Sequence, residues 1–128
     1  MRLLLDTQLV LWWLNGDPAL PKQVEALVMA PGSQTYVSKA SLWEMAIKRS
    51  LGKLDADLPR IVEEIPAIGM RYLDIQAEHV LKLAELPTFD DHKDPFDRML
   101  VAQSLTEPLL LLTTDGKLGR YGPTIRQV

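Results

Sequence analysis

Residues 92–98 (HKDPFDR) predict where the main helix of the C-terminal half begins. Proline fits the first position of a helix, where its missing N–H costs nothing. Asp94 can then be the N-cap, and Asp97 falls at the third helical position. Apolar residues recur behind them at roughly helical spacing, which predicts a mostly buried helix that Pro108 ends. Two carboxylates therefore stand at the positive end of one helix, and capping alone accounts for one of them.

Length and composition predict a single globular domain over residues 1–128. The chain is 47% hydrophobic and 24% charged, which is ordinary for a globular protein. It contains no cysteine, so disulfides, thiolate zinc sites and thiol catalysis are excluded, and a reducing cytoplasm suits it. No apolar run approaches the ~20 residues that span a membrane, and Asp6 interrupts the N-terminal run too early for a signal peptide. The net charge of −3 gives no overall basic field for nucleic acid.

Strand-like segments alternate with helical ones along the whole chain. Strands are predicted at residues 2–5, 35–38, 72–75, 109–112 and 124–128, with helices at 8–15, 21–30, 41–51, 58–68, 77–86 and 95–107. This alternation predicts an α/β three-layer sandwich with a mostly parallel sheet. The segments at 2–5 and 109–112 are the most aliphatic, which places them side by side at the centre. The expected strand order is 3-2-1-4-5, and ligands in such folds bind beyond the carboxyl ends of the strands at the topological switch.

Acidic residues fall at or near that same edge of the predicted sheet. Asp6 ends the first strand, Asp97 begins the helix before the fourth strand, and Asp115 follows the fourth strand. If Ser41 to Glu44 form an S-x-x-E capping box, Glu44 lies in the first turn of the helix after the second strand. Each acid alone is explained by a cap or a turn. Together, four crowded carboxylates repel one another, and a divalent cation with oxygen ligands, Mg²⁺ or Mn²⁺, is the usual compensation. Such a site suits a phosphodiester hydrolase.

The chain resembles the PIN domain, and within it the VapC-like ribonuclease toxins of bacterial toxin–antitoxin pairs. The resemblance covers nearly the whole chain. It rests on four motifs in order: residues 3–7 (LLLDT), 37–44 (VSKASLWE), 94–98 (DPFDR) and 112–115 (LTTD).

The resemblance also implies roles for particular residues. It makes Asp6, Glu44, Asp97 and Asp115 both the catalytic residues and the ligands of one or two Mg²⁺ or Mn²⁺ ions. It implies hydroxyls lining the site from Thr7, Ser38 and Thr114, whereas capping is the favoured role for Asp94. The expected substrate is RNA, single-stranded or structured. The expected partners are a second copy in a homodimer and a small antitoxin that covers the site.

The sequence also gives expectations for several other residues. His79 is predicted to lie on a helix surface, and His92 in a loop without an identified partner. Either Trp12 or Trp13 is expected in the core, with the other at a dimer or antitoxin groove. Basic side chains around the acids are candidates for phosphate contacts, with ordinary solvated surface as the alternative. They are Lys39, Lys48, Arg49, Lys53, Lys93, Arg98, Lys117 and Arg120.

Two other function classes remain open from the sequence. A phosphoacceptor receiver domain has a similar length and an acidic Mg²⁺ pocket. However, it needs two adjacent acids after the first strand, where this chain has Asp6 and Thr7, and it needs an exposed acid ending the third strand, whereas Asp74 is predicted inside that strand. The second alternative is a PIN-like module that binds RNA or protein without catalysis, although the presence of all four acids argues against it.

Overall fold

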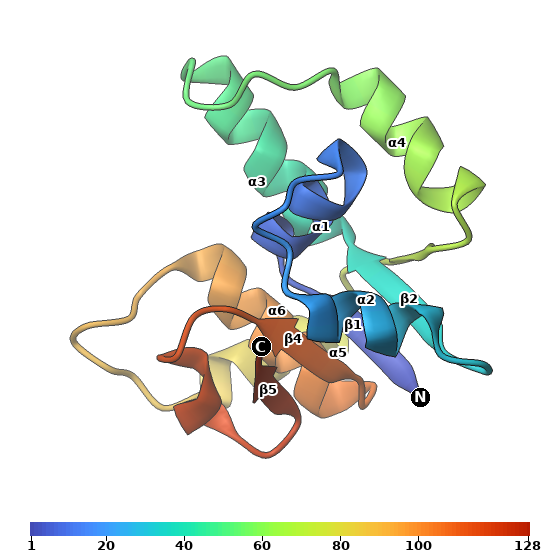
Figure 1. Cartoon of the computed structure of the whole chain (residues 1–128). Coiled ribbons are helices and arrows are strands. Elements are labelled where there is room, and N and C mark those ends of the chain that lie inside the picture. Colours follow the sequence, from blue (N-terminus) through green and yellow to red (C-terminus); the bar gives the residue numbers. More distant parts are fainter.

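The computed structural model describes all residues from Met1 to Val128. Strands alternate with helices along the chain, as predicted (Figure 1). The strands are β1 (Arg2–Leu5), β2 (Gln34–Ser38), β3 (Arg71–Leu73), β4 (Leu110–Thr113) and β5 (Ile125–Gln127). The helices are α1 (Thr7–Asn15), α2 (Lys22–Met29), α3 (Lys39–Ser50), α4 (Leu58–Ala67), α5 (Ala77–Glu85) and α6 (Pro95–Thr106), and a short 3₁₀ helix, η1, spans Leu118–Tyr121.

All five strands are parallel and follow the order β3-β2-β1-β4-β5, which confirms the predicted topology. The central strand β1 is completely buried from Leu3 to Leu5, as expected of a strand covered on both faces. Leu4 lies between Tyr36 of β2 and Leu111 of β4. The carboxyl ends of β1, β2 and β4 therefore meet at one edge of the sheet.

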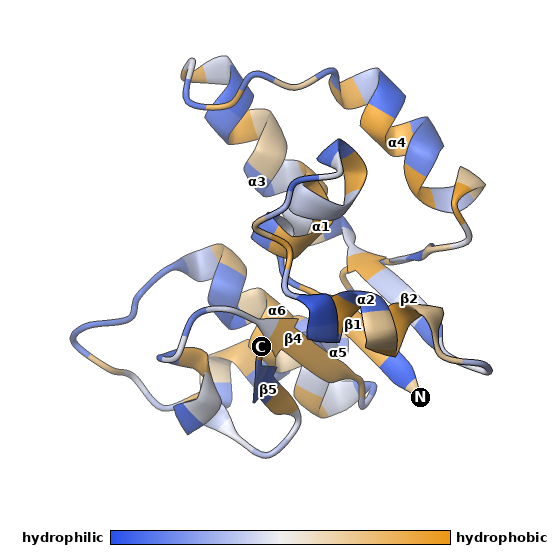
Figure 2. Ribbon diagram, in the orientation of Figure 1, coloured by the Kyte–Doolittle hydropathy of each residue, from blue (hydrophilic) through white to orange (hydrophobic).

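Two hydrophobic cores lie on the opposite faces of the sheet. Successive side chains of a strand point to opposite faces. Accordingly, Leu3 and Leu5 belong to a core shared with α1 to α4, and Leu4 belongs to a core shared with α6 and η1. The hydrophobic colouring concentrates where helices meet the sheet (Figure 2). Trp12 and Trp13 are both half-buried at the margin of the first core, so neither is the core residue that was expected.

The start of α3 differs from the predicted capping box. The helix begins at Lys39, directly after β2, and its N-cap is Ser38, whose hydroxyl accepts a 3.0 Å hydrogen bond from the Ala40 N–H. Ser41 is buried inside the helix and accepts a 2.9 Å bond from the Thr7 hydroxyl, so the predicted capping box is wrong. Glu44 consequently lies in the second turn of α3.

The third strand is shorter than predicted. It ends at Leu73, so the placement of Asp74 inside the strand is wrong. Asp74 is exposed and forms a 2.8 Å ion pair with Lys39. The predicted start of α6 is confirmed: Asp94 is its N-cap and accepts a 2.9 Å bond from the Asp97 N–H.

None of the helices combines the length and the apolar character needed to cross a lipid bilayer.

Candidate metal-binding active site

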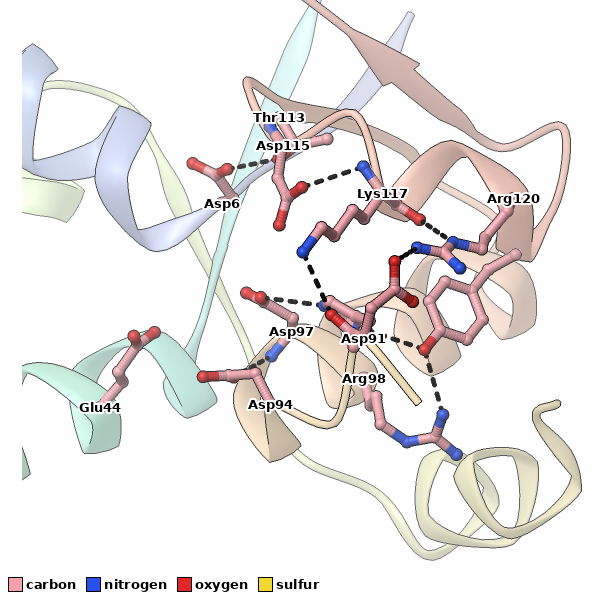
Figure 3. A network of polar contacts seen from close by, with 12 residues as sticks. Asp6, Glu44, Asp91, Asp94, Asp97, Arg98, Thr113, Asp115, Lys117 and Arg120 are labelled. Atoms are coloured by element: carbon pink, nitrogen blue, oxygen red, sulfur yellow. Dashed lines mark hydrogen bonds and ion pairs between the residues drawn. The ribbon is translucent and has the colours of Figure 1, made fainter. Parts of the chain in front are cut away.

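The acidic residues gather in a cleft of about 250 Å³ at the carboxyl edge of the sheet. Leu11 is the only hydrophobic residue in its wall and Lys48 the only cationic one. The carboxylates come from four separate parts of the chain, and Figure 3 shows how they lie. The acids that line the cleft are Asp6, Glu44, Asp94, Asp97 and Asp115. The structure thus brings together all four acids predicted as metal ligands.

Asp6 is held rigidly between β1 and α1. Its carboxylate accepts a 2.9 Å bond from the Leu9 N–H, as the N-cap of α1, and a 2.7 Å bond from the Thr113 hydroxyl. Burial raises the pKa of Asp6; those two hydrogen bonds oppose the rise, and the charges of Glu44 and Asp115 add to it. The Thr113 contact was not predicted. The contact follows from the register of the parallel strands β1 and β4. Leu5 pairs with Leu112, so the next residues, Asp6 and Thr113, are neighbours.

Glu44 reaches the cleft from α3 and forms a 2.9 Å ion pair with Lys48, one turn further along that helix. Glu44 is largely buried, whereas half of the Lys48 side chain is exposed. The hydrogen bond to Glu44 raises the pKa of Lys48, and the negative charges of Asp94 and Asp97 add to the effect.

Asp97 is the acid whose charged form is most strongly disfavoured. Burial is the largest cause and repulsion by Asp94 the next, and together they raise the pKa of Asp97 to about 6. The nearby charge of Glu44 contributes in the same direction, whereas a 3.2 Å contact between the Asp97 Oδ2 and His92 Nε2 opposes it. Asp94 has two roles, since its side chain caps α6 and also lines the cleft.

Asp115 completes the wall of the cleft from the loop after β4. Its carboxylate accepts a 2.9 Å bond from the Lys117 N–H, so the Asp-Gly turn predicted as its alternative role is also present. Ligand atoms of His92, Asp97 and Asp115 all lie within 4.8 Å of one another. Asp97 and Asp115 are therefore close enough to bind the same ion, whereas both ring nitrogens of His92 are engaged by Tyr121 and Asp97.

The predicted hydroxyl residues divide into two groups. Thr7 and Thr114 line the cleft. Ser38 does not, because its completely buried side chain caps α3.

Most of the basic residues near the cleft are already engaged in contacts within the chain. Lys48 pairs with Glu44, Lys39 with Asp74, and Arg120 with Asp91 at 2.9 Å. Lys117 and Arg98 each donate a hydrogen bond to a backbone carbonyl oxygen. Arg49, Lys53 and Lys93 form neither an ion pair nor a side-chain hydrogen bond, so these three are the free cations among the predicted phosphate contacts.

The prediction of a surface position for His79 is wrong, whereas His92 lies in a loop as predicted, with partners that the sequence did not identify. His79 is completely buried, and its Nε2 lies 2.6 Å from the Glu107 carboxylate. His92 is only 6% exposed and contacts both Asp97 and the Tyr121 hydroxyl. The contacts with Glu107 and Tyr121 could not be identified from sequence spacing, because both depend on how the chain folds around α6.

The donor set of the cleft fits a hard divalent cation. It offers carboxylate and hydroxyl oxygens and no sulfur, the chemistry preferred by Mg²⁺ and Mn²⁺. Burial and mutual repulsion already disfavour the charged forms of Asp6 and Asp97, so a positive ion between these carboxylates would remove the main electrostatic cost of the arrangement.

The PIN domain family profile matches residues 3–122, and the chain belongs to this family. No curated protein sequence matches the chain. Membership in the PIN family excludes the receiver-domain alternative, whose fold has the strand order 2-1-3-4-5.

Solved structures share the fold over nearly their whole length. The VapBC2 complex of Rickettsia felis, bound to a DNA fragment from its promoter, contains a chain with a TM-score of 0.72 and 17% identity, covering 99% of this chain and 98% of that one. The structure of FitAB bound to the IR36 DNA fragment contains a chain with a TM-score of 0.72 and 16% identity, and the match covers 99% of this chain and 94% of that one. DNA-bound VapBC from Salmonella typhimurium contains a chain with a TM-score of 0.65 and 18% identity, and the match covers 100% of this chain and 97% of that one. At these identities the likeness establishes the fold.

Proposed function

We propose that this chain is a Mg²⁺- or Mn²⁺-dependent endoribonuclease, the toxin of a toxin–antitoxin pair acting in the cytoplasm. The observation that carries the proposal is the cleft, in which five carboxylates line the carboxyl edge of a PIN fold. A role in scaffolding alone does not explain it, because the burial and the repulsion that raise the pKa of Asp97 both oppose folding with this carboxylate charged.

In this proposal Asp6, Glu44, Asp97 and Asp115 hold the cation. A divalent ion held by these residues would polarise a phosphoryl oxygen and would lower the pKa of an attacking water. Asp94 fixes the first turn of α6, on which Asp97 stands.

The protein contributes the rigid placement of these oxygens. Asp6 is held by a backbone N–H and by Thr113, so it needs little reorganisation when a cation binds. The half-exposed Lys48 lies in the wall of the cleft, where its ammonium group can meet a substrate phosphate once a cation shares the charge of Glu44. Because the net charge is −3, RNA must be attracted by such local cations rather than by the whole protein surface.

We also propose that the chain forms a homodimer and binds a small antitoxin that covers the cleft. Support comes from the similar folds seen in VapBC and FitAB complexes and in a toxin–antitoxin complex from Klebsiella pneumoniae. The chain also exposes large apolar side chains that a partner would cover, among them Trp43 at 59% and Leu51 at 62%.

The proposal is tested by incubating purified protein with total bacterial RNA and mapping new RNA ends by sequencing. Total RNA is the appropriate substrate because a selective toxin ignores a generic oligonucleotide. We expect new ends with Mg²⁺ or Mn²⁺, and none with excess chelator. Glu63→Gln changes an exposed carboxylate on α4 and should cut like the wild type. If no RNA in the pool is cut with either metal, or if cutting continues in chelator, the proposal is wrong.

A further inference from the structure

The loop between α5 and α6 is fastened to η1 next to the acidic cleft. The carboxylate of Asp91 accepts a 2.9 Å hydrogen bond from the Arg120 guanidinium, and the backbone carbonyl oxygen of Asp91 accepts a 3.2 Å hydrogen bond from the Lys117 ammonium group. The Phe89 ring packs edge-on against Tyr121 at 5.1 Å, and the Arg120 guanidinium lies 4.4 Å from the centre of the Phe89 ring. These contacts fix the loop that carries His92.

His92 stands at the centre of a chain of hydrogen bonds that ends on Asp97. The Arg98 Nη1 donates to the Tyr121 hydroxyl oxygen at 3.1 Å. The Tyr121 hydroxyl lies 2.8 Å from His92 Nδ1, and His92 Nε2 lies 3.2 Å from Asp97 Oδ2. Figure 3 shows Arg98 and Asp97 at the two ends of this network.

The two ends of the network determine the direction of every donor. Arginine can only donate, and an ionised carboxylate can only accept. His92 must therefore carry its proton on Nε2 and donate it to Asp97. Its Nδ1 is then the acceptor for the Tyr121 O–H, while the oxygen of Tyr121 accepts from Arg98. The opposite direction would leave the O–H of the buried Tyr121 without an acceptor among its observed contacts.

The contact with His92 engages only one oxygen of Asp97. Oδ2 accepts from His92, and Oδ1 makes no hydrogen bond within the chain. Donation to one oxygen of a carboxylate ligand fixes its rotation and leaves the other oxygen available, which is how outer residues commonly orient metal ligands.

We infer that His92 is a positioning residue, which Tyr121 and Arg98 hold in the Nε2–H tautomer so that it orients the Asp97 carboxylate toward a cation in the cleft. This inference rests on the proposed function. It assigns a role to the histidine of the HKDPFDR stretch, for which the sequence alone identified no partner.

The test compares two amides that replace different halves of the imidazole. His92→Gln can place its amide N–H near the position of Nε2 and keep the donor to Asp97. His92→Asn reaches only the position of Nδ1, so it keeps the contact with Tyr121 and loses the donor. We expect calorimetric titration with Mn²⁺ at pH 8 to give a dissociation constant about 10-fold weaker for His92→Asn, and within about 3-fold of the wild type for His92→Gln. Thermal melting without metal should give similar midpoints for the two variants.

A second measurement does not depend on metal binding. Long-range ¹H–¹⁵N NMR of the metal-free protein should show His92 as the neutral Nε2–H tautomer, with its resonances assigned by their loss in His92→Asn. In Tyr121→Phe the same spectrum should show a mixture of tautomers. An Nδ1–H tautomer in the wild type, equal Mn²⁺ affinity in all variants, or a loss in His92→Gln as large as in His92→Asn would overturn the inference. Failure of the wild type to bind Mn²⁺ while the tautomer is as expected would instead overturn the proposed metal-dependent function.

Discussion

The two ends of helix α6 each hold a carboxylate against a buried histidine, but their surroundings are opposite. At the first turn, Asp97 contacts His92 and faces the charges of Asp94 and Glu44 in the cleft. At the C-terminal end, the Glu107 carboxylate lies 2.6 Å from the completely buried His79. The first end concentrates negative charge, whereas the second contains a compact pair that ties α5 to α6.

The pair at the C-terminal end is explained by stability alone. His79 Nδ1 accepts a 2.9 Å bond from the Gln76 N–H at the start of α5, so Nε2 carries the proton and donates to Glu107. With its one free lone pair already used, this imidazole is not available as a metal ligand, although Glu78, His79 and Glu107 lie close enough to suggest one. The same pairing of residue types can therefore serve folding at one end of a helix and, in our proposal, chemistry at the other.

The largest expected difference between the two ends is in RNA cleavage. Asp97→Asn should reduce the rate roughly 100-fold or more, because even residues that only orient a metal ligand commonly contribute 10- to 100-fold. Glu107→Gln removes the matching charge at the other end and should stay within about 3-fold of the wild type. Rates measured on one mapped RNA site would show the contrast. Equal losses in the two variants would mean that the cleft has no special role.

The next-largest difference is in stability, which should depend on the C-terminal end of α6 and not on Asp97. His79→Ala should lower the free energy of unfolding by about 2–3 kcal/mol, since it opens a cavity and leaves buried polar partners unpaired. Metal-free Asp97→Asn should be at least as stable as the wild type at pH 7.5, because it relieves repulsion. Urea denaturation followed by circular dichroism measures both. A clear destabilisation by Asp97→Asn would show that this carboxylate supports the fold.

The stability of the metal-free protein should also depend on pH through Asp97. Its pKa is raised from 3.8 to about 6 in the native state, so the native state binds the proton more tightly than the unfolded state. The stability gained from this proton is complete below about pH 3.8 and is lost as the pH rises through 6. Relative to Asp97→Asn, the wild type should lose about 1 kcal/mol between pH 5 and 7.5. Urea titrations of both proteins at the two pH values measure this change. If the pKa of Asp97 is ordinary, the difference in unfolding free energy between the wild type and Asp97→Asn will be the same at both pH values.

The smallest expected effect concerns Asp94. Asp94→Ser keeps a side chain that can cap α6 and removes one negative charge next to Asp97. The pKa of Asp97 should fall, and Mn²⁺ affinity should stay within about 3-fold if capping is the main role of Asp94. Carboxyl NMR titration and calorimetry give the two values. A 10-fold or greater loss of Mn²⁺ affinity would make Asp94 a ligand.

The strand order and the gathering of the acids were accessible from the sequence, because each depended on a local pattern that the tertiary structure preserved. Aliphatic runs at residues 2–5 and 109–112 marked the central strands, and Asp94 and Pro95 marked the start of α6. The start of α3 was missed because Ser38 and Ser41 are both chemically suitable caps. The selection between them depends on where β2 ends, which the sheet determines.

The histidine contacts were not accessible in the same way. His92 is brought to Tyr121 across 29 residues, and His79 to Glu107 across 28, by packing against α6. Thr113 was accessible in principle, because once the parallel register of β1 and β4 is known, it must lie beside Asp6.

Anomalous diffraction from crystals soaked in Mn²⁺ would show directly whether the acids of the cleft bind a metal ion. We expect a manganese peak in the cleft within coordination distance of Asp97 and at least one other acid, and no peak at the His79–Glu107 pair. A cleft without manganese at saturating Mn²⁺, with its carboxylates ordered and free of lattice contacts, would contradict the claim that these acids form a metal site.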